Sequence, residues 1–199
     1  NVLGGRNTWE GFTSTPAITS TGAYGTAVFR LDTINLIRKF EANDLRFSQW
    51  IGMGKTTAGT SVYFPYKYKV RTTTSGIMEY SMVMRLAEQY LIRAEARIQQ
   101  GKLDDGRGDL DAIRHRAGLA NLSTSLTQPA LLLAVEQERK VELFAEWGHR
   151  WFDLKRTKRA DAVLGPIKGA NWQPTDTLYP IPSDAIRTNA NLTQNEGYK

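Results

Sequence analysis

The chain has 199 residues, 41% of them hydrophobic, which is enough for one sizeable folded domain. It contains no cysteine, which excludes a disulfide scaffold, a thiol nucleophile and a zinc site built on cysteine. The formal net charge is +6, but much of the positive charge lies between Arg150 and Arg159, at the end of a predicted helical region, so we interpret it as a solvated or partner-facing surface and expect no nucleic-acid binding.

The first 79 residues are predicted to be rich in loops. Residues 1–27 contain many Gly, Thr and Ser residues, and residues 28–45 have a mixed apolar pattern that predicts one or two loosely specified helices. Residues 51–61 are interpreted as a Gly/Thr loop. Residues 62–73 alternate aromatic or apolar side chains with basic ones, a pattern typical of a strand or a short hairpin, with Pro65 at an edge.

Residues 80–160 form the predicted helical nucleus. Apolar residues recur at helical spacing in Tyr80–Gln100, Asp104–Arg116 and Gln128–Trp147, and the connections between these segments are short. Because none of these helices can bury its apolar stripe alone, we expect all three to pack as neighbours. The residues expected to be mostly buried are Tyr90, Leu91, Ala94, Leu110, Ile113, Val135, Leu143 and Phe144.

One helix pair in this nucleus has the residue pattern of a tetratricopeptide unit. Gly101 supplies the turn, and Gly106 stands five residues later, where such units usually carry a small residue. A free-standing array of this kind needs about three units, so a single unit is expected to pack into a larger fold. Residues 161–199 are predicted to be irregular and to fold back on the helices, which gives one domain overall.

The sequence contains few residue patterns typical of catalytic, nucleotide-binding or metal-binding sites. The run Ile51-Gly-Met-Gly-Lys-Thr-Thr57 lacks the first glycine and the following helix of a phosphate-binding loop. Neither His115 nor His149 has a second ligand at helical spacing, so no metal and no cofactor are expected. A glycan hydrolase would need two carboxylates across a cleft, whereas the glutamates here stand on helices beside arginines.

Those charged residues are interpreted as structural ion pairs. Glu142 and Glu146 stand four residues apart, as do Glu146 and Arg150, which suits pairing on a surface or at a helix junction. Arg150 and Asp153 are expected to turn inward and join this junction. The full set of predicted structural ion-pair residues is Arg139, Glu142, Glu146, Arg150 and Asp153.

Several runs in the second half of the chain resemble the SusD/RagB family. They are Arg85-Leu-Ala-Glu-Gln-Tyr-Leu-Ile-Arg-Ala-Glu-Ala96, Ile113-Arg-His-Arg-Ala-Gly-Leu119, Glu138-Arg-Lys-Val-Glu-Leu143, Glu146-Trp-Gly-His-Arg-Trp-Phe-Asp-Leu-Lys-Arg156 and the tail from Tyr179-Pro-Ile-Pro-Ser183 to Tyr198. Asp44-Leu-Arg46 also matches an Asp-x-Arg element that is common in this family. The resemblance implies a mainly α fold, in which tetratricopeptide-like helix pairs pack together with irregular loops and a short β-hairpin.

The resemblance also implies a function. Members of this family are outer-membrane lipoproteins that bind oligosaccharides or polysaccharides at the cell surface, without catalysis, and cap a SusC-like TonB-dependent transporter for nutrient uptake. Family members are much longer than this chain, which therefore resembles the C-terminal part of one. The signal peptide and the lipid-bearing cysteine would then lie upstream, and membrane attachment would be through that lipid alone.

Two other functions remain open. The first is a tetratricopeptide-type scaffold that binds a protein, and the second is a hydrolase. For glycan binding, the sequence offers aromatic residues outside the helical stripes, because sugars stack their C–H faces on aromatic rings. The predicted ligand-binding residues are Trp50, Tyr63, Tyr66, Trp9 and Trp172, with Tyr68 on the same predicted strand as the two tyrosines. Trp50 adjoins Ser48 and Gln49, whose polar groups would suit a neutral sugar.

Overall fold

A computed structural model of the protein describes residues 7–21, 23–56, 58–73, 76 and 78–198. The chain divides into two compact units, Asn1–Trp147 and Gly148–Lys199. The first unit contains α1 (Trp9–Ser14), the 3-10 helix η1 (Ile37–Lys39), α2 (Leu45–Trp50), β1 (Ile51–Lys55), β2 (Ser61–Pro65), α3 (Leu86–Gln99), α4 (Leu103–Arg116) and α5 (Gln128–Glu142). The second contains α6 (His149–Arg156), α7 (Ala160–Lys168), the 3-10 helices η2 (Gly169–Asn171) and η3 (Pro174–Thr177), and α8 (Ser183–Thr188).

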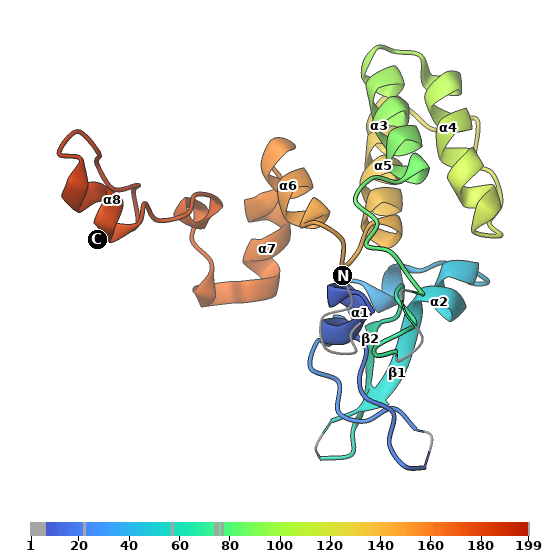
Figure 1. Ribbon diagram of the computed structural model, residues 1–199. Helices are drawn as coiled ribbons and strands as arrows, with labels where there is room; N and C mark the ends of the chain where they lie inside the picture. Colours follow the sequence, from blue (N-terminus) through green and yellow to red (C-terminus); the bar gives the residue numbers. More distant parts are fainter. Residues whose placement is uncertain (1–6, 22, 57, 74–75, 77, 199) are drawn as a thin grey trace. The chain divides into compact units, whose positions relative to one another are not determined.

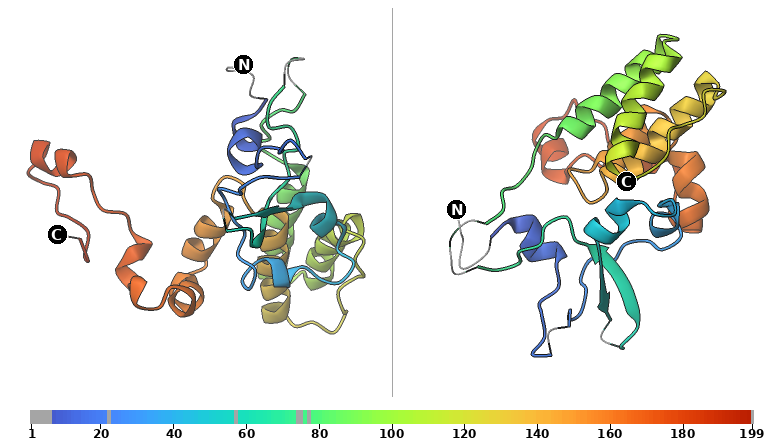
Figure 2. Two further views of the ribbon diagram at one scale, coloured as in Figure 1. Left: turned by 90° about the horizontal axis from the view of Figure 1, so that it is seen from below. Right: turned by 90° about the vertical axis from the view of Figure 1, so that its right-hand side faces the viewer.

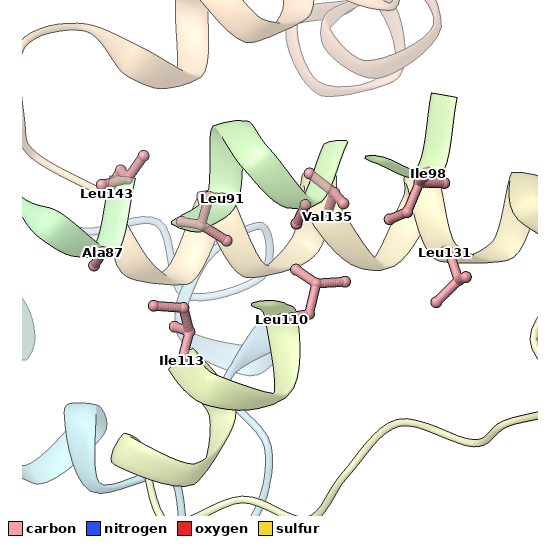
Figure 3. Close-up of a cluster of buried hydrophobic side chains, with 9 residues drawn as sticks. Ala87, Leu91, Ile98, Leu110, Ile113, Leu131, Val135 and Leu143 are labelled. Atoms are coloured by element: carbon pink, nitrogen blue, oxygen red, sulfur yellow. The ribbon is translucent and has the colours of Figure 1, made fainter. Parts of the chain in front are cut away.

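The core of the first unit lies between α3, α4 and α5, which pack side by side (Figures 1 and 2). Leu91 of α3, Leu110 of α4 and Val135 of α5 converge between the helices (Figure 3), and none of the three is more than 2% exposed. Of the eight residues expected to be mostly buried, all but the partly buried Tyr90 are buried. The three-helix nucleus predicted from the sequence is therefore confirmed.

The start of the first helix was predicted too early. The helical segment was expected to begin at Tyr80, but α3 starts at Leu86. The side chains of both residues are exposed. Residues 78–85 are irregular instead, and Arg85 at the N-cap takes an extended backbone conformation. Gly101 supplies the turn between α3 and α4 (Leu103–Arg116) as expected, with a φ of 78° that suits glycine.

The two glycines of α4 have different environments. Gly106 is buried against α3, where a Cβ atom would stand 2.5 Å from Ile98 Cγ1 and 2.9 Å from the carbonyl oxygen of Ala94. Gly108 faces open space. The helices approach closely at Gly106 because it has no side chain, and Asp109 then binds Arg93 and Arg97 of α3 at 2.7 and 2.8 Å. Gly106 is thus a contact point of the helix pair.

The third helix is shorter than predicted. It begins after Thr127, with Pro129 in its first turn as expected, but ends at Glu142 and not at Trp147. Ala145 and Trp147 both take positive φ values, 56° and 39°, which no α-helix accommodates. Trp147, the last residue of the predicted helix, is 53% exposed, and its indole donates a hydrogen bond to the carbonyl oxygen of Met82.

The β-hairpin was predicted in the wrong place. Residues 51–61 were interpreted as a loop, but they supply β1, which pairs antiparallel with β2, Gly52 lying opposite Phe64. The Phe64 ring covers Gly52 so closely that a Cβ there would stand 2.2 Å from it. Gly52, one of the glycines that suggested a loop, is therefore required for the strand to lie under an aromatic ring. Beyond Pro65, residues 66–73 are irregular and not a strand.

The N-terminal region has more order than expected. Residues 1–6 of the predicted loop lie outside the described residues, but Trp9–Ser14 forms α1, capped by the Thr8 side chain. Between residues 28 and 45, the expected helices reduce to turns and η1. Helix α2 starts at Leu45 because Asp44 accepts a hydrogen bond from the Arg46 backbone N–H.

The second unit has its own small core, in which Leu154, Ala160 and Trp172 are buried. Residues 161–199 were predicted to be irregular, but α7 occupies most of 160–168 despite Pro166, and η3 and α8 follow. No described helix is both long and apolar enough to cross a bilayer. The mainly α fold with a short hairpin is confirmed. The predicted domain limits and the packing of residues 161–199 on the helices stay predictions.

Candidate functional site

Trp50 stands at the end of α2, where the chain turns directly into β1. One edge of its indole packs towards the buried Phe144, with ring centroids 6.5 Å apart. Three cationic groups surround the ring: Lys67 Nζ at 4.7 Å from the centroid, Arg116 Cζ at 5.6 Å and Arg85 Cζ at 5.8 Å. These distances are within the range of cation–π attraction, so the indole and the cations stabilise one another.

A pocket of about 160 Å³ opens beside this ring. Its walls come from the end of α2, the segment after β2, the extended segment before α3 and the loop after α5. The residues that line it are Trp50, Lys67, Tyr68, Met82, Arg85 and Glu146. All of these belong to the first unit. The wall combines an aromatic face and a thioether with two cations, a phenol and a carboxylate.

Glu146 joins the two cations of the pocket. One carboxylate oxygen binds Lys67 Nζ, and the other lies 3.0 Å from Arg85 Nε. Lys67 also donates to the carbonyl oxygen of Glu142 at 2.7 Å. Burial lowers the pKa of the Lys67 ammonium to about 8, and the attraction of Glu146 offsets only part of this effect. The pocket therefore contains an amine that titrates not far above neutral pH.

A buried charge network supports the pocket from behind. Glu142 has no exposed side-chain surface, and its carboxylate binds Arg46, Arg85 and Arg116. Arg46 is itself buried and also binds Asp44 and Glu138, which links α2 to α5. Removing charges from water is costly unless each is paired, and here each carboxylate meets at least one guanidinium. The Asp44-Leu-Arg46 element is thus part of this network.

The predicted glycan-binding residues have different surroundings. Trp50 and Tyr68 line the pocket, and the Tyr68 hydroxyl accepts a hydrogen bond from the Met82 backbone. Tyr63 is partly buried and packs edge-on to Phe47. Tyr66 packs against Tyr24 and Phe64, with Lys69 over its ring.

The two other predicted tryptophans are not among the residues that line the pocket. Trp9 is 62% exposed on α1. Trp172 belongs to the second unit, where its ring is 8% exposed and its indole donates to Asp161 at 2.9 Å. Whether any of the predicted residues contacts a ligand stays a prediction.

The predicted structural ion-pair residues lie in both units. Glu142 and Glu146 pair with arginine and lysine residues from distant segments of the first unit. Arg139 is buried in α5. In the second unit, Asp153 is buried and binds Arg156 of the same helix at 2.8 Å, while Arg150 stands on the first turn of α6.

Lys67, Met82 and Arg85 were missed as pocket residues. Nothing in their local pattern distinguishes them, because the pocket is assembled from segments far apart in the chain. Across the part of the chain that the structure describes, no group of three His, Asp or Glu side chains could hold a metal ion. His115 is exposed and contacts Asn121.

Comparison with known proteins gives a consistent result. The model of the SusD family matches residues 50–198. The chain is 33% identical over 132 residues to the starch-binding protein SusD of Bacteroides thetaiotaomicron, an alignment that covers 59% of this chain and 21% of that protein. It is 37% identical over 130 residues to the SusD-like protein P2 of Formosa agariphila, covering 58% of this chain and 25% of that protein.

Solved structures extend the similarity to the fold. A SusD superfamily protein from Parabacteroides distasonis superposes with a TM-score of 0.65 and 28% identity, covering 84% of this chain and 42% of that chain. Another from Bacteroides thetaiotaomicron reaches a TM-score of 0.69 at 22% identity, with coverage of 96% and 43%, and supports the fold alone. The chain thus spans about a quarter or less of the curated relatives described here and under half of these solved ones.

Proposed function

The chain belongs to the SusD family, and on this premise we propose that the protein binds an oligosaccharide or polysaccharide at the bacterial cell surface without cleaving it. The observation that carries the proposal is the pocket beside Trp50, in which an aromatic face stands next to hydrogen-bonding groups. The name of the relative from Bacteroides thetaiotaomicron, a starch-binding protein, supports a carbohydrate as the class of ligand.

The chemistry of the pocket suits a sugar. A pyranose ring presents a flat apolar C–H face, which an indole can cover, and hydroxyl groups around its edge, which charged side chains can bind. The volume of about 160 Å³ is well below the roughly 300–1,000 Å³ of pockets for drug-sized ligands, so it would hold about one sugar unit of a longer chain. Single-site affinity would then be weak, and several contacts along a polysaccharide would strengthen binding.

Among the predicted contact residues, Trp50 has the best support. It lines the pocket together with Tyr68, whereas the exposed Trp9 could stack on a sugar only as a separate platform. The edge-on packing of Tyr63 and Tyr66 among other rings leaves less of their faces free. Burial of Trp172 in the core of the second unit argues against stacking on that ring.

The absence of catalysis is part of this proposal. Hydrolysis of a glycosidic bond uses a pair of carboxylic groups facing the same bond. Glu146 lines the pocket, but the nearby Glu142 has no exposed side-chain surface and is bound by three arginines. A carboxylate held in this way cannot reach a sugar, which supports binding without turnover.

Family membership supports a proposal for location and partner. We propose that the protein lies at the outward face of the outer membrane, attached by a lipid on a part of the polypeptide not contained in this chain. There it would pass oligosaccharides to a SusC-like TonB-dependent transporter. Copurification of such a transporter from detergent-solubilised outer membranes, with the tagged intact protein as bait, would test this partnership.

Affinity gel electrophoresis of the intact protein tests the binding directly. Native gels would contain starch, pectin, carrageenan, laminarin or no polysaccharide, with serum albumin as the reference protein. We expect retardation in at least one polysaccharide gel and no release of reducing sugar over a day. If every polysaccharide in a broad panel leaves the mobility unchanged, the proposed function is wrong.

A further inference from the structure

The pocket is lined by two cations, Lys67 and Arg85, and by one carboxylate, Glu146. Both cations also lie within 6 Å of the indole centroid of Trp50. The buried Glu142 behind them is shared between Arg85, Arg116 and Arg46, and Arg46 is balanced in turn by Asp44 and Glu138. Within the lining itself, Glu146 is therefore the carboxylate that faces both cations.

Glu146 is the removable carboxylate of this group. Its side chain is 11% exposed, and it stands in the short loop after α5, not within a helix. The residues on either side, Ala145 and Trp147, have φ values of 56° and 39°, a region that costs non-glycine residues of order 1–3 kcal/mol. The loop thus holds a carboxylate between two cations at the expense of backbone strain.

An anionic group of a ligand could take the place of Glu146. Lys67 Nζ and Arg85 Nε point at the same carboxylate from two different segments, and a carboxylate or sulfate ester presents oxygens with similar spacing. Such a group on a sugar ring would lie at the cations while the C–H face of the ring covered Trp50.

We propose, building on the proposed function, that this pocket selects an acidic sugar, whose carboxylate or sulfate displaces Glu146 from Lys67 and Arg85. A neutral sugar would have to leave Glu146 in place and would lose the charged contacts. Whether the pocket prefers a carboxylate or a sulfate depends on which anion fits between Lys67 and Arg85. Titration with one ligand of each kind distinguishes the two.

Calorimetric titration of the intact protein tests the proposal. The ligands are a galacturonic acid tetrasaccharide, a sulfated carrageenan tetrasaccharide and neutral maltotetraose, each at low and at high salt. We expect one acidic ligand to bind at least tenfold more tightly than maltotetraose, with an affinity that falls as salt increases. If maltotetraose binds as tightly as both acidic ligands, the inference is wrong, although the proposed glycan binding stands. If no glycan binds, the proposed function itself fails.

Variants locate the effect. Lys67→Met removes a cation and should weaken acidic-sugar binding at least tenfold, whereas Lys69→Met, two residues away and outside the pocket lining, should leave it unchanged. Glu146→Gln removes the competing carboxylate and should tighten binding about five- to tenfold. Because the Glu146 variant must improve binding, a misfolded protein cannot imitate the expected result. A melting curve would first show that Glu146→Gln is folded. If this folded variant binds the acidic sugar more weakly than the wild type, the proposal that the sugar displaces Glu146 is wrong.

Discussion

Glu142 is the residue on which the buried charges of the first unit converge. Burial acts to raise the pKa of its carboxyl group, but hydrogen bonds and attraction from Arg116 and Arg85 outweigh burial, so the pKa lies below its ordinary value. Glu138, one turn earlier on α5, has the opposite balance: burial dominates, and its pKa is raised in spite of Arg46 and Arg114. The two glutamates therefore contribute to stability with opposite signs of pH dependence.

The first prediction compares these two positions. Glu142→Gln should destabilise the fold by about 3–5 kcal/mol, because it leaves buried guanidinium groups without their shared carboxylate. Glu138→Gln should cost less, about 1–2 kcal/mol, because its charged form is already disfavoured in the folded protein. Urea unfolding at neutral pH measures both. Equal costs, or a larger cost for Glu138, would contradict the network described here.

The second prediction concerns Lys67. An unfolded lysine keeps its proton to about pH 10.4, whereas folded Lys67 loses it near pH 8, so the unfolded state binds more protons between these values and stability rises with pH. From about pH 7.5 to about pH 9.5, the wild type should gain on the order of 1 kcal/mol relative to Lys67→Met. Above this window Tyr24, whose pKa burial raises to about 12, acts in the opposite direction. If the free energies of unfolding of the wild type and Lys67→Met change in parallel with pH, the pKa of Lys67 is not lowered as described.

At the level of elements, the close packing of α3 and α4 depends on the lack of a side chain at Gly106. Gly106→Ala forces a methyl group against Ile98 and the backbone of α3, so we expect a loss of about 1–3 kcal/mol. Gly108→Ala is the matched control, because it meets nothing within 4 Å and should stabilise α4 by about 0.5–1 kcal/mol. Thermal melting of both variants gives the comparison. Stabilisation by both substitutions would mean that the helices do not approach closely at Gly106.

Helices and strands could be predicted well from the sequence where a single local pattern of apolar residues determines them. The stripe through Leu91, Ala94 and Ile98 repeats at helical spacing, and each residue is buried as that spacing requires. The hairpin could not be placed in the same way, because Gly52 and Gly54 favour a loop locally, and the need for glycine at position 52 is explained only by Phe64 on the partner strand. The end of α5 could not be predicted either. The helix ends at Glu142, which is fixed by the buried charge network, and no capping residue in the local sequence marks this end.

The site was predictable only in part, for the same reason. Trp50 could be chosen because an aromatic residue outside a helical stripe stands out in the sequence. Lys67, Arg85 and Glu146 could not, because they are separated by up to 79 residues and meet only through the tertiary fold. Arg85 in particular continues an apparent helix pattern, although it lies on the extended segment before α3.

At the scale of the whole molecule, the three-helix core holds the pocket segments of the first unit in place. Leu91 has no exposed surface and lies at the centre of that core, so Leu91→Ala should cost about 2–5 kcal/mol. Leu133→Ala on the exposed side of α5 is the control and should change stability by less than about 0.5 kcal/mol. Denaturant midpoints compare the two. A small effect at Leu91 would remove the basis for treating these helices as the stabilising core.

The central claim is that a sugar stacks on Trp50, and calorimetric titration of the tightest-binding oligosaccharide against Trp50→Ala tests it most directly. Covering one aromatic face contributes about 1–2 kcal/mol, so the variant should bind about 5- to 30-fold more weakly. Trp50→Phe should retain part of the affinity, and Phe29→Ala, an exposed aromatic residue outside the pocket, should bind like the wild type. Unchanged affinity in a folded Trp50→Ala protein would contradict the account.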